Sequence, residues 1–182
     1  MGKIILVTGG QRSGKSTYAE EKTLALAGSG KAIYMATSRI WDDEFAKRVQ
    51  IHKNRRGEQW HNIEEEKYLH KHNVSGFPVL IDCVTLWATN FYFDSIQKSE
   101  NGCTNDNISI ESILKQIKDE FEKFTAQEAT FIFVTNEIGL GGISENRVQR
   151  QFTDLLGWLN QYIASKADEV FFMVSGIPMR IK

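Results

Sequence analysis

The stretch that decides the fold is residues 9–16 (GGQRSGKS), which follows a short apolar run and precedes a helical pattern. Glycines let a backbone turn sharply and approach an anion, and successive N–H groups with the N-terminus of the next helix then face that anion. The spacing Gly-x-x-x-x-Gly-Lys-Ser therefore predicts a loop that binds nucleotide phosphates. The residues expected at the phosphates are Gly9, Gly10, Gln11, Arg12, Ser13, Gly14, Lys15 and Ser16.

Two further groups are expected beside this loop. Lys15 can reach the β- and γ-phosphates, and the Ser16 hydroxyl can ligate Mg²⁺. Residues 79–82 (VLID) form a second apolar run that ends on Asp82. Ligands gather at the carboxyl ends of parallel strands, so Asp82 is expected to hold the metal, directly or through water. Alternatively, Asp82 caps the helix that follows it.

Strand and helix patterns alternate along the whole chain. Strands are predicted at 3–8, 31–37, 59–63, 77–84, 130–135 and 169–174, the last clear one. Helices are predicted at 15–27, 42–55, 64–72, 85–93, 108–124 and 145–166. The polar run 98–107 is predicted to be a mobile loop, and 136–144 a glycine-rich loop.

The predicted strands are apolar on both faces, which favours a parallel sheet covered on both sides. We therefore predict an α/β fold with a doubly wound, mostly parallel sheet and helices on both faces. This is the fold of the P-loop NTPases, here of the RecA-like kind, as a single domain over residues 1–182.

Composition excludes several classes of function. The formal net charge is −1, from 22 Lys and Arg against 23 Asp and Glu. This balance indicates neither nucleic-acid nor anionic-membrane binding. The apolar runs fall short of the ~20 residues that a membrane helix needs. Cys83 and Cys103 lack metal-site spacing, which favours reduced thiols and a cytoplasmic location.

His52 has two interpretations. It shares one predicted helix face with Phe45 and Val49, so it is either a half-buried packing residue or a nucleophile or proton carrier. The cluster Lys53, Asn54, Arg55 and Arg56 follows at once. It is either a solvated helix end or a group of contacts to phosphate.

Five stretches carry a resemblance to a known family: ILVTGGQRSGKS, YMATSRIWDDEFAKRVQIHKNRR, VLIDCVT, VTNEIGLGGISENRVQRQF and ADEVFFMVSGIPMRIK. Together they resemble, nearly end to end, the bifunctional adenosylcobinamide kinase / adenosylcobinamide-phosphate guanylyltransferases of cobalamin assembly. The second stretch is the most specific, because a phosphate loop alone names only a superfamily.

The resemblance implies a role for each matching position. His52 would carry a covalent guanylyl group, and Lys53, Asn54, Arg55 and Arg56 would contact the nucleotide held there. Ala36, Thr37 and Ser38 would line the same site, and Glu64 and Asp82 match acidic positions at it. The substrates would be GTP and ATP with Mg²⁺, the acceptors adenosylcobinamide and its phosphate, and the assembly a homotrimer.

The sequence departs from the family pattern at three places. Ile51 stands where some relatives carry a second histidine, which leaves His52 as the candidate nucleophile. Asp82 stands where others have Glu, and 98–107 resembles a local insertion. Residues 136–139 (NEIG) and 145–147 (ENR) either contact a substrate or serve helix capping and loop structure.

Two other functions compete with this interpretation. Another small-molecule kinase would use the same loop and metal site and leave His52 idle. A regulatory GTP-binding switch would need an Asn-Lys-x-Asp motif and an Asp-x-x-Gly directly after the strand that ends on Asp82. The sequence has no Asn-Lys-x-Asp, and the strand is followed by Cys-Val-Thr.

Overall fold

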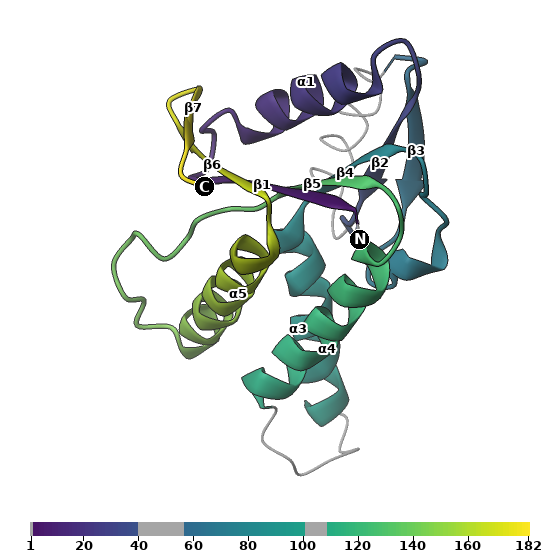
Figure 1. Cartoon of the computed structure of the whole chain (residues 1–182). Helices are drawn as coiled ribbons and strands as arrows, with labels where there is room; N and C mark the ends of the chain where they lie inside the picture. The colour runs from purple at the N-terminus through teal and green to yellow at the C-terminus, as the bar shows by residue number, and fades with distance from the viewer. Residues whose placement is uncertain (1, 40–56, 101–108) are drawn as a thin grey trace.

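The computed structural model describes residues 2–39, 57–100 and 109–182, which form a seven-stranded sheet with helices on both faces (Figure 1). The strand order is β3-β2-β4-β5-β1-β6-β7. Neighbouring strands are parallel except for the antiparallel pair β6–β7. The strands are β1 (Lys3–Gly9), β2 (Ala32–Ala36), β3 (Trp60–Glu64), β4 (Pro78–Asp82), β5 (Thr130–Val134), β6 (Glu169–Val174) and β7 (Ile177–Arg180).

The helices divide unequally between the two faces. Helix α1 (Lys15–Ala27) covers one face, and α3 (Val84–Glu100), α4 (Ile110–Thr125) and α5 (Arg147–Lys166) cover the other (Figure 1). A short 3-10 helix, η1 (Leu69–Lys71), packs against α4. The doubly wound, mostly parallel α/β sheet that the sequence predicts is confirmed.

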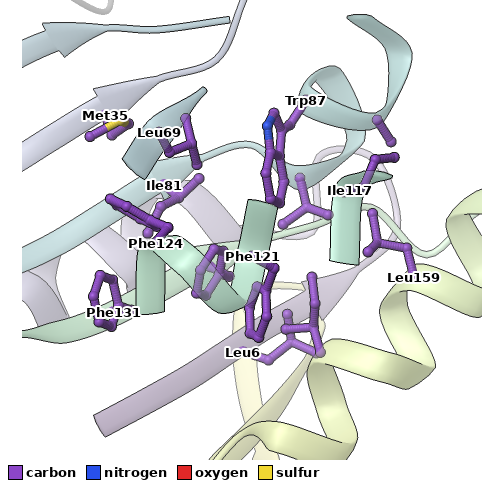
Figure 2. Packing of buried hydrophobic residues seen from close by; sticks show 14 of the residues in the cluster. Leu6, Met35, Leu69, Ile81, Trp87, Ile117, Phe121, Phe124, Phe131 and Leu159 are labelled. Carbon is purple, nitrogen blue, oxygen red and sulfur yellow. The ribbon is translucent and has the colours of Figure 1, made fainter. Parts of the chain in front are cut away.

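Alternation along the strands builds two separate cores. On β1, Ile4 and Leu6 belong to the cluster under α3, α4 and α5, whereas Ile5 and Val7 belong to the cluster under α1. Successive side chains of a strand point to opposite faces, so an apolar strand supplies both. Figure 2 shows the larger cluster, where Phe121, Phe124 and Trp87 from the helices meet Leu6, Met35, Ile81 and Phe131 from the strands.

The carboxyl ends of five strands lie level with one another. The register places Val7, Val134, Asp82, Ala36 and Glu64 side by side, on β1, β5, β4, β2 and β3. The phosphate-loop strand β1 and the Asp82 strand β4 are thus separated by β5 alone. This edge is where ligands bind in open α/β sheets.

The predicted helix over 64–72 is wrong. Strand β3 continues through Glu64, which pairs with Ala36. The Glu65 carboxylate then accepts hydrogen bonds from the backbone N–H groups of Lys67 and Tyr68, both 3.0 Å long. Such local side-chain bonds compete with helix formation. Only the single 3-10 turn η1 remains of the predicted helix.

Two other expectations also need correction. Residues 98–100 are not loop, because α3 runs to Glu100 instead of ending near 93, and the rest of the predicted loop lies outside the described residues. Residues 169–174 are not the last strand, because β7 returns antiparallel to β6. The intervening turn, Ser175-Gly176, was a readable signal, since hairpin turns favour glycine.

Several predictions lie outside the described residues: the helix over 42–55, His52, and the cluster Lys53, Asn54, Arg55 and Arg56. The single domain over residues 1–182 likewise stays a prediction. Within the part of the chain that the structure describes, none of the helices combines the length and apolarity needed to cross a membrane.

Candidate active site

A cavity of about 380 Å³ opens at the carboxyl ends of β1, β4 and β5. It lies between the phosphate loop on one side and the end of the Asp82 strand on the other. Its lining residues are Gln11, Arg12, Ser13, Gly14, Lys15, Ser16, Thr17, Asp82, Cys83, Val134, Thr135 and Asn136. Residues 11–16, predicted at the phosphates, and Asp82, predicted at the metal, therefore border one space.

The phosphate loop is closed by short-range hydrogen bonds. The Ser13 N–H donates to the Gly10 carbonyl over 3.3 Å, and the Tyr18 N–H donates to the Gly14 carbonyl over 3.1 Å as α1 begins. Arg12 and Gly14 have φ of 59° and 92°, the left-handed region. The loop thus delivers the N-terminus of α1 to the cavity, where helix N–H groups and the helix dipole favour an anion.

Gly9 and Gly14 have no room for a side chain. A Cβ at Gly9 would lie 2.6 Å from the Met173 carbonyl oxygen, and one at Gly14 would lie 3.0 Å from the Cα of Gly176. The two glycines at the ends of the motif are therefore required by the close approach of β6 and of the β6–β7 turn. Gly9 and Gly10 do not themselves border the cavity within the described ranges.

Lys15 is folded onto its own loop. Its ammonium donates to the Gly10 carbonyl over 2.5 Å and to the Ser13 Oγ over 3.4 Å, and the residue is only 7% exposed. Burial lowers the pKa of Lys15 below its ordinary value, and the nearby Cys83 and Asp82 act in the opposite direction. A buried ammonium with two neutral acceptors is poised to exchange them for phosphate oxygens.

Asp82 faces α1 because it alternates with Leu80, a member of the α1-face cluster. The Tyr34 hydroxyl donates to Asp82 Oδ2 and fixes the carboxylate. Asp82 and Ser16 border the same cavity. One carboxylate and one hydroxyl beside a phosphate site suit Mg²⁺, which keeps several waters and shares substrate phosphates. Among the described residues, no three His, Cys, Asp or Glu gather into a metal site of their own.

Thr37 lies outside the cavity wall and holds the backbone of Cys83, which borders the cavity. Its Oγ1 donates to the Cys83 carbonyl over 2.8 Å and accepts from the Cys83 N–H over 2.9 Å. Its own carbonyl accepts from Asn90 Nδ2 over 2.8 Å, which joins β2 to α3. Thr37 is fully buried, so it positions the Asp82–Cys83 backbone. Burial also raises the pKa of the Cys83 thiol to about 12, which keeps that thiol protonated at neutral pH.

The remaining sequence candidates lie beside the cavity. Ala36 ends β2 between Asp82 and Glu64, and Ser38 follows it as a half-buried residue. Glu64 is two strands from Asp82, about 10 Å at the usual strand spacing. Within the described ranges, the cavity wall does not include Ala36, Thr37, Ser38 or Glu64.

Sequence reasoning named Asn136 as a possible substrate contact but missed Val134 and Thr135, which belong to the same wall at the end of β5. Val134, Thr135 and Asn136 border the cavity beside Asp82. The Asn136 N–H donates to Thr85 Oγ1 over 2.9 Å, and Thr135 Oγ1 donates to Asn160 Oδ1 over 2.8 Å. The available signal was the position of these residues at the carboxyl end of a parallel strand that neighbours both β1 and β4.

Two side chains of the 136–139 and 145–147 motifs make structural contacts. The Glu137 carboxylate accepts from the Gly139 N–H over 2.7 Å. Asn146 is the N-cap of α5, and its side chain accepts from the Gln149 N–H over 3.1 Å. Loop structure and helix capping, one of the two alternatives, thus account for these two side chains.

Comparison with known proteins identifies the family of this chain. A family model described as cobinamide kinase / cobinamide phosphate guanyltransferase matches residues 5–181. The chain is 38% identical to the bifunctional adenosylcobalamin biosynthesis protein CobU of Escherichia coli (strain K12), over 98% of this chain and 99% of that protein. It is 34% identical to the protein CobP of Pseudomonas aeruginosa that carries the same description, over 97% and 96%.

Among solved structures, the flagellar accessory protein FlaH from Methanocaldococcus jannaschii aligns with a TM-score of 0.48 and 13% identity. The alignment covers 100% of this chain and 78% of that one.

The match to the family model spans both sides of the cavity, the phosphate loop and the Asp82 strand. The chain therefore belongs to the cobinamide kinase / cobinamide phosphate guanyltransferase family.

Proposed function

We propose that this protein is a bifunctional enzyme that carries out two successive reactions on one corrinoid. It phosphorylates adenosylcobinamide with ATP or GTP, and then transfers GMP from GTP to adenosylcobinamide phosphate. The product of the second reaction is adenosylcobinamide-GDP, an intermediate in assembly of the cobalamin nucleotide loop. The observation that carries the proposal is the cavity in which Lys15 and Asp82 converge, in a chain that matches the family over 5–181.

The kinase step needs little beyond positioning and charge neutralisation. The aminopropanol hydroxyl of adenosylcobinamide attacks the γ-phosphorus and loses its proton. The bond from the γ-phosphorus to its bridging oxygen breaks, and the nucleoside diphosphate leaves. Lys15 would give up its hydrogen bonds to the Gly10 carbonyl and the Ser13 hydroxyl and donate to the phosphate oxygens instead. The N–H groups at the start of α1 would face the same negative charge.

The guanylyl step uses a covalent intermediate. A neutral nitrogen of His52 attacks the α-phosphorus of GTP, and pyrophosphate leaves. An oxygen of adenosylcobinamide phosphate then attacks that phosphorus, the phosphorus–nitrogen bond breaks, and His52 is released. Because the two steps attack different phosphorus atoms, the nucleotide and His52 must meet differently in each. Lys53, Asn54, Arg55 and Arg56 would contact the nucleotide held on His52, and Ala36, Ser38 and Glu64 would border it.

We further propose that Ser16 and Asp82 hold Mg²⁺ together with the nucleotide phosphates. When bound, the ion would neutralise the charge on those phosphates. The Tyr34 hydroxyl would keep Asp82 oriented toward it. A short aspartate can serve here because the carboxylate already borders the cavity.

A homotrimer is proposed for the assembly. Ile177 and Met179 on β7 are 65% and 53% exposed, and Leu140 and Ile143 on the 136–144 loop are 78% and 91% exposed. Apolar side chains of this exposure favour contact with another subunit. A solution mass of three times the 20.8 kDa chain by light scattering would support the trimer, and a monomer would contradict it. The cytoplasmic location stays a prediction.

The deciding experiment is covalent labelling. The protein and the variant His52→Ala are incubated with Mg²⁺ and GTP labelled on the α-phosphate, denatured, and assayed for bound label. We expect an acid-labile, base-stable label on the native protein and none on His52→Ala. A matched control, His61→Ala, changes an exposed histidine on β3 and should label fully.

Labelling with γ-phosphate-labelled GTP separates the two chemistries, because pyrophosphate leaves in the guanylyl step and no label should remain. A native protein that binds GTP but takes no α-label would refute the guanylyltransferase half. Kinase turnover that persists in that case would favour a small-molecule kinase. Nucleotide-dependent partner binding with slow hydrolysis would favour a GTP switch.

A further inference from the structure

Strand β7 contributes nothing to the two described core clusters, whereas its partner β6 supplies Val170, Phe171 and Met173 to them. All four β7 residues are exposed, and none belongs to either described core cluster. Burial of apolar side chains usually drives the ordering of a strand at the edge of a sheet. Burial within this chain therefore does not explain the order of β7, and the tip of the hairpin contacts the phosphate loop.

The tip is a two-residue turn with an unusual backbone. Val174 pairs directly with Ile177, so Ser175 and Gly176 are the whole loop. Their φ angles are 51° and 85°, which type I′ hairpin turns require at both central positions. Ser175 is one of two non-glycine residues with positive φ among the described residues. The other, Arg12, lies in the phosphate loop itself.

The tip is bonded to the phosphate loop. The Gly176 N–H donates to the Ser13 carbonyl over 2.9 Å. Gly14 approaches so closely that a Cβ there would lie 3.0 Å from the Gly176 Cα. Next to the tip, β6 pairs with β1 up to the register Gly9↔Met173. The loop is therefore held by the hairpin from its first glycine to its last.

The hydrogen bond to the Ser13 carbonyl also fixes the orientation of the Ser13–Gly14 peptide. A trans peptide is planar, so its C=O and N–H groups point in opposite directions. The Ser13–Gly14 peptide is trans, and its carbonyl is fixed on the hairpin side. The Gly14 N–H must then point away from the hairpin, and Gly14 borders the cavity on that side. A flip of this peptide would present a carbonyl oxygen to the anion instead.

We propose that the Ser175-Gly176 tip is a positioning element of the nucleotide site, which holds the Ser13–Gly14 peptide in the orientation that donates to phosphate. Gly176 is thus a positioning residue although it lies 160 residues from the loop in sequence. The inference deepens the proposed function and rests on it, because it assumes that the loop binds nucleotide phosphates. It predicts an effect on the affinity for phosphates and little effect on chemistry after binding.

The chain offers a closely matched control. Gly76 also has φ of 85°, and its N–H also donates to a distant carbonyl, that of Glu128, over 2.8 Å. A Cβ at either glycine would meet nothing within 4 Å. Gly176→Ala and Gly76→Ala therefore impose the same backbone strain with the same added atom. They differ in what the turn touches, since Gly76 lies before β4, at the opposite end of the sheet from the cavity.

The experiment measures binding of pyrophosphate and of Mg²⁺–GTP by calorimetry, and kinase kinetics, for the wild-type chain and both variants. We expect both variants to lose similar thermal stability. Gly176→Ala should weaken both ligands about tenfold, which is ~1.4 kcal/mol, and raise KM while kcat changes little. Gly76→Ala should bind both ligands as the wild type does. Pyrophosphate carries no base, so a loss for this ligand reports the phosphate cradle.

Two further variants keep the test decisive if Gly176→Ala does not fold. Asn tolerates positive φ and a β-branched residue does not, so Ser175→Asn relieves the turn and Ser175→Val strains it. We expect Ser175→Val to bind pyrophosphate several-fold more weakly than Ser175→Asn. Equal affinities in this pair, or in the glycine pair, would overturn the proposal. A wild-type chain that binds neither ligand would instead overturn the proposed function.

Discussion

The face of the sheet under α1 and the face under α3, α4 and α5 are built from the same strands but differ in content. The α1 face carries a thin apolar cluster and, at its carboxyl edge, Lys15, Tyr34 and Asp82. The other face carries the larger cluster, with Phe121, Phe124 and Trp87 fully buried (Figure 2).

The difference shows that one sheet can place most of its apolar burial on one face and its polar active-site groups on the other. The helices that bury the most apolar surface lie on the face away from Lys15 and Asp82. The α1 face can therefore hold polar groups at a cavity without bearing most of the burial. We call the face under α3, α4 and α5 the thick face. We expect variants on the thick face to change stability and variants on the α1 face to change nucleotide chemistry.

The strongest test of the thick face is Phe121→Ala. Phe121 is fully buried and lies 5.2 Å, centroid to centroid, from the ring of Phe133. Removal of such a side chain leaves a cavity, so we expect a loss of about 3–5 kcal/mol in the free energy of unfolding by urea. At a temperature where the variant is folded, its affinity for GTP should equal that of the wild type.

The control for Phe121→Ala is Phe93→Ala, because Phe93 is 39% exposed on α3. It should cost far less stability, since part of its ring is already in water. If the GTP affinity of Phe121→Ala fell in parallel with its stability, the two faces would not have separate roles.

The matching test of the α1 face is Lys15→Ala. Loss of one preorganised donor to transition-state charge costs about 10²–10³-fold in kcat, so we expect a fall of that size in phosphoryl transfer. The midpoint of urea unfolding should change little or rise, because a partly desolvated ammonium is removed. Steady-state kinase assays and urea titrations measure the two quantities.

Lys22→Ala serves as the comparison on the same helix. Lys22 pairs with Glu169 over 3.3 Å and lies away from the cavity wall. It should retain wild-type turnover. If Lys15→Ala keeps more than about a tenth of the wild-type kcat, Lys15 does not stabilise the transferred phosphoryl group.

A smaller effect is expected from the ion pair that joins α3 to the end of β2. Arg39 Nη1 donates to Asp94 Oδ1 over 2.7 Å, and this bond holds the pKa of Asp94 at about 2, below the ordinary 3.8. Because the pKa is depressed on folding, the stabilisation is fully present above pH 4 and is lost as pH falls through about 2. We expect Asp94→Asn to cost about 1–2 kcal/mol at pH 7.

Urea unfolding of the wild type and Asp94→Asn at pH 7, 4 and 2 checks this prediction. The gap between the two free energies should persist from pH 7 to 4 and close by pH 2. A gap that stays constant to pH 2 would mean that the cost arises from packing and not from charge. GTP affinity at pH 7 should be unchanged in the variant.

The smallest effect is expected from Asn146→Ala, which removes the N-cap of α5 on the thick face. Loss of such a cap costs typically about 1 kcal/mol of unfolding free energy. Asn146→Ser should restore most of it, because serine also caps well. A fall in kcat/KM for the acceptor in Asn146→Ala that Asn146→Ser does not rescue would assign this residue to the substrate instead.

Much of the fold was predictable because local patterns agreed with the tertiary structure. The apolar strands were predicted to within a few residues, because a strand buried on both faces reads as a continuous apolar run. The predicted helix over 64–72 failed because polar side-chain bonds set the local structure there. The Glu65 carboxylate accepts hydrogen bonds from two backbone N–H groups. The predictions also failed at β7, which is exposed and carries no burial signal.

The candidate site divides in the same way. The sequence by itself determined the phosphate loop, Lys15, Ser16 and Asp82, because a short motif with fixed spacing encodes the local geometry that phosphates demand. Only the tertiary structure decided which other strands meet that motif. It placed Thr135 and Asn136 in the cavity wall, Thr37 behind Cys83, and Gly176 against Ser13. These contacts join residues 46–163 positions apart, and such pairings depend on strand order, which no local pattern records.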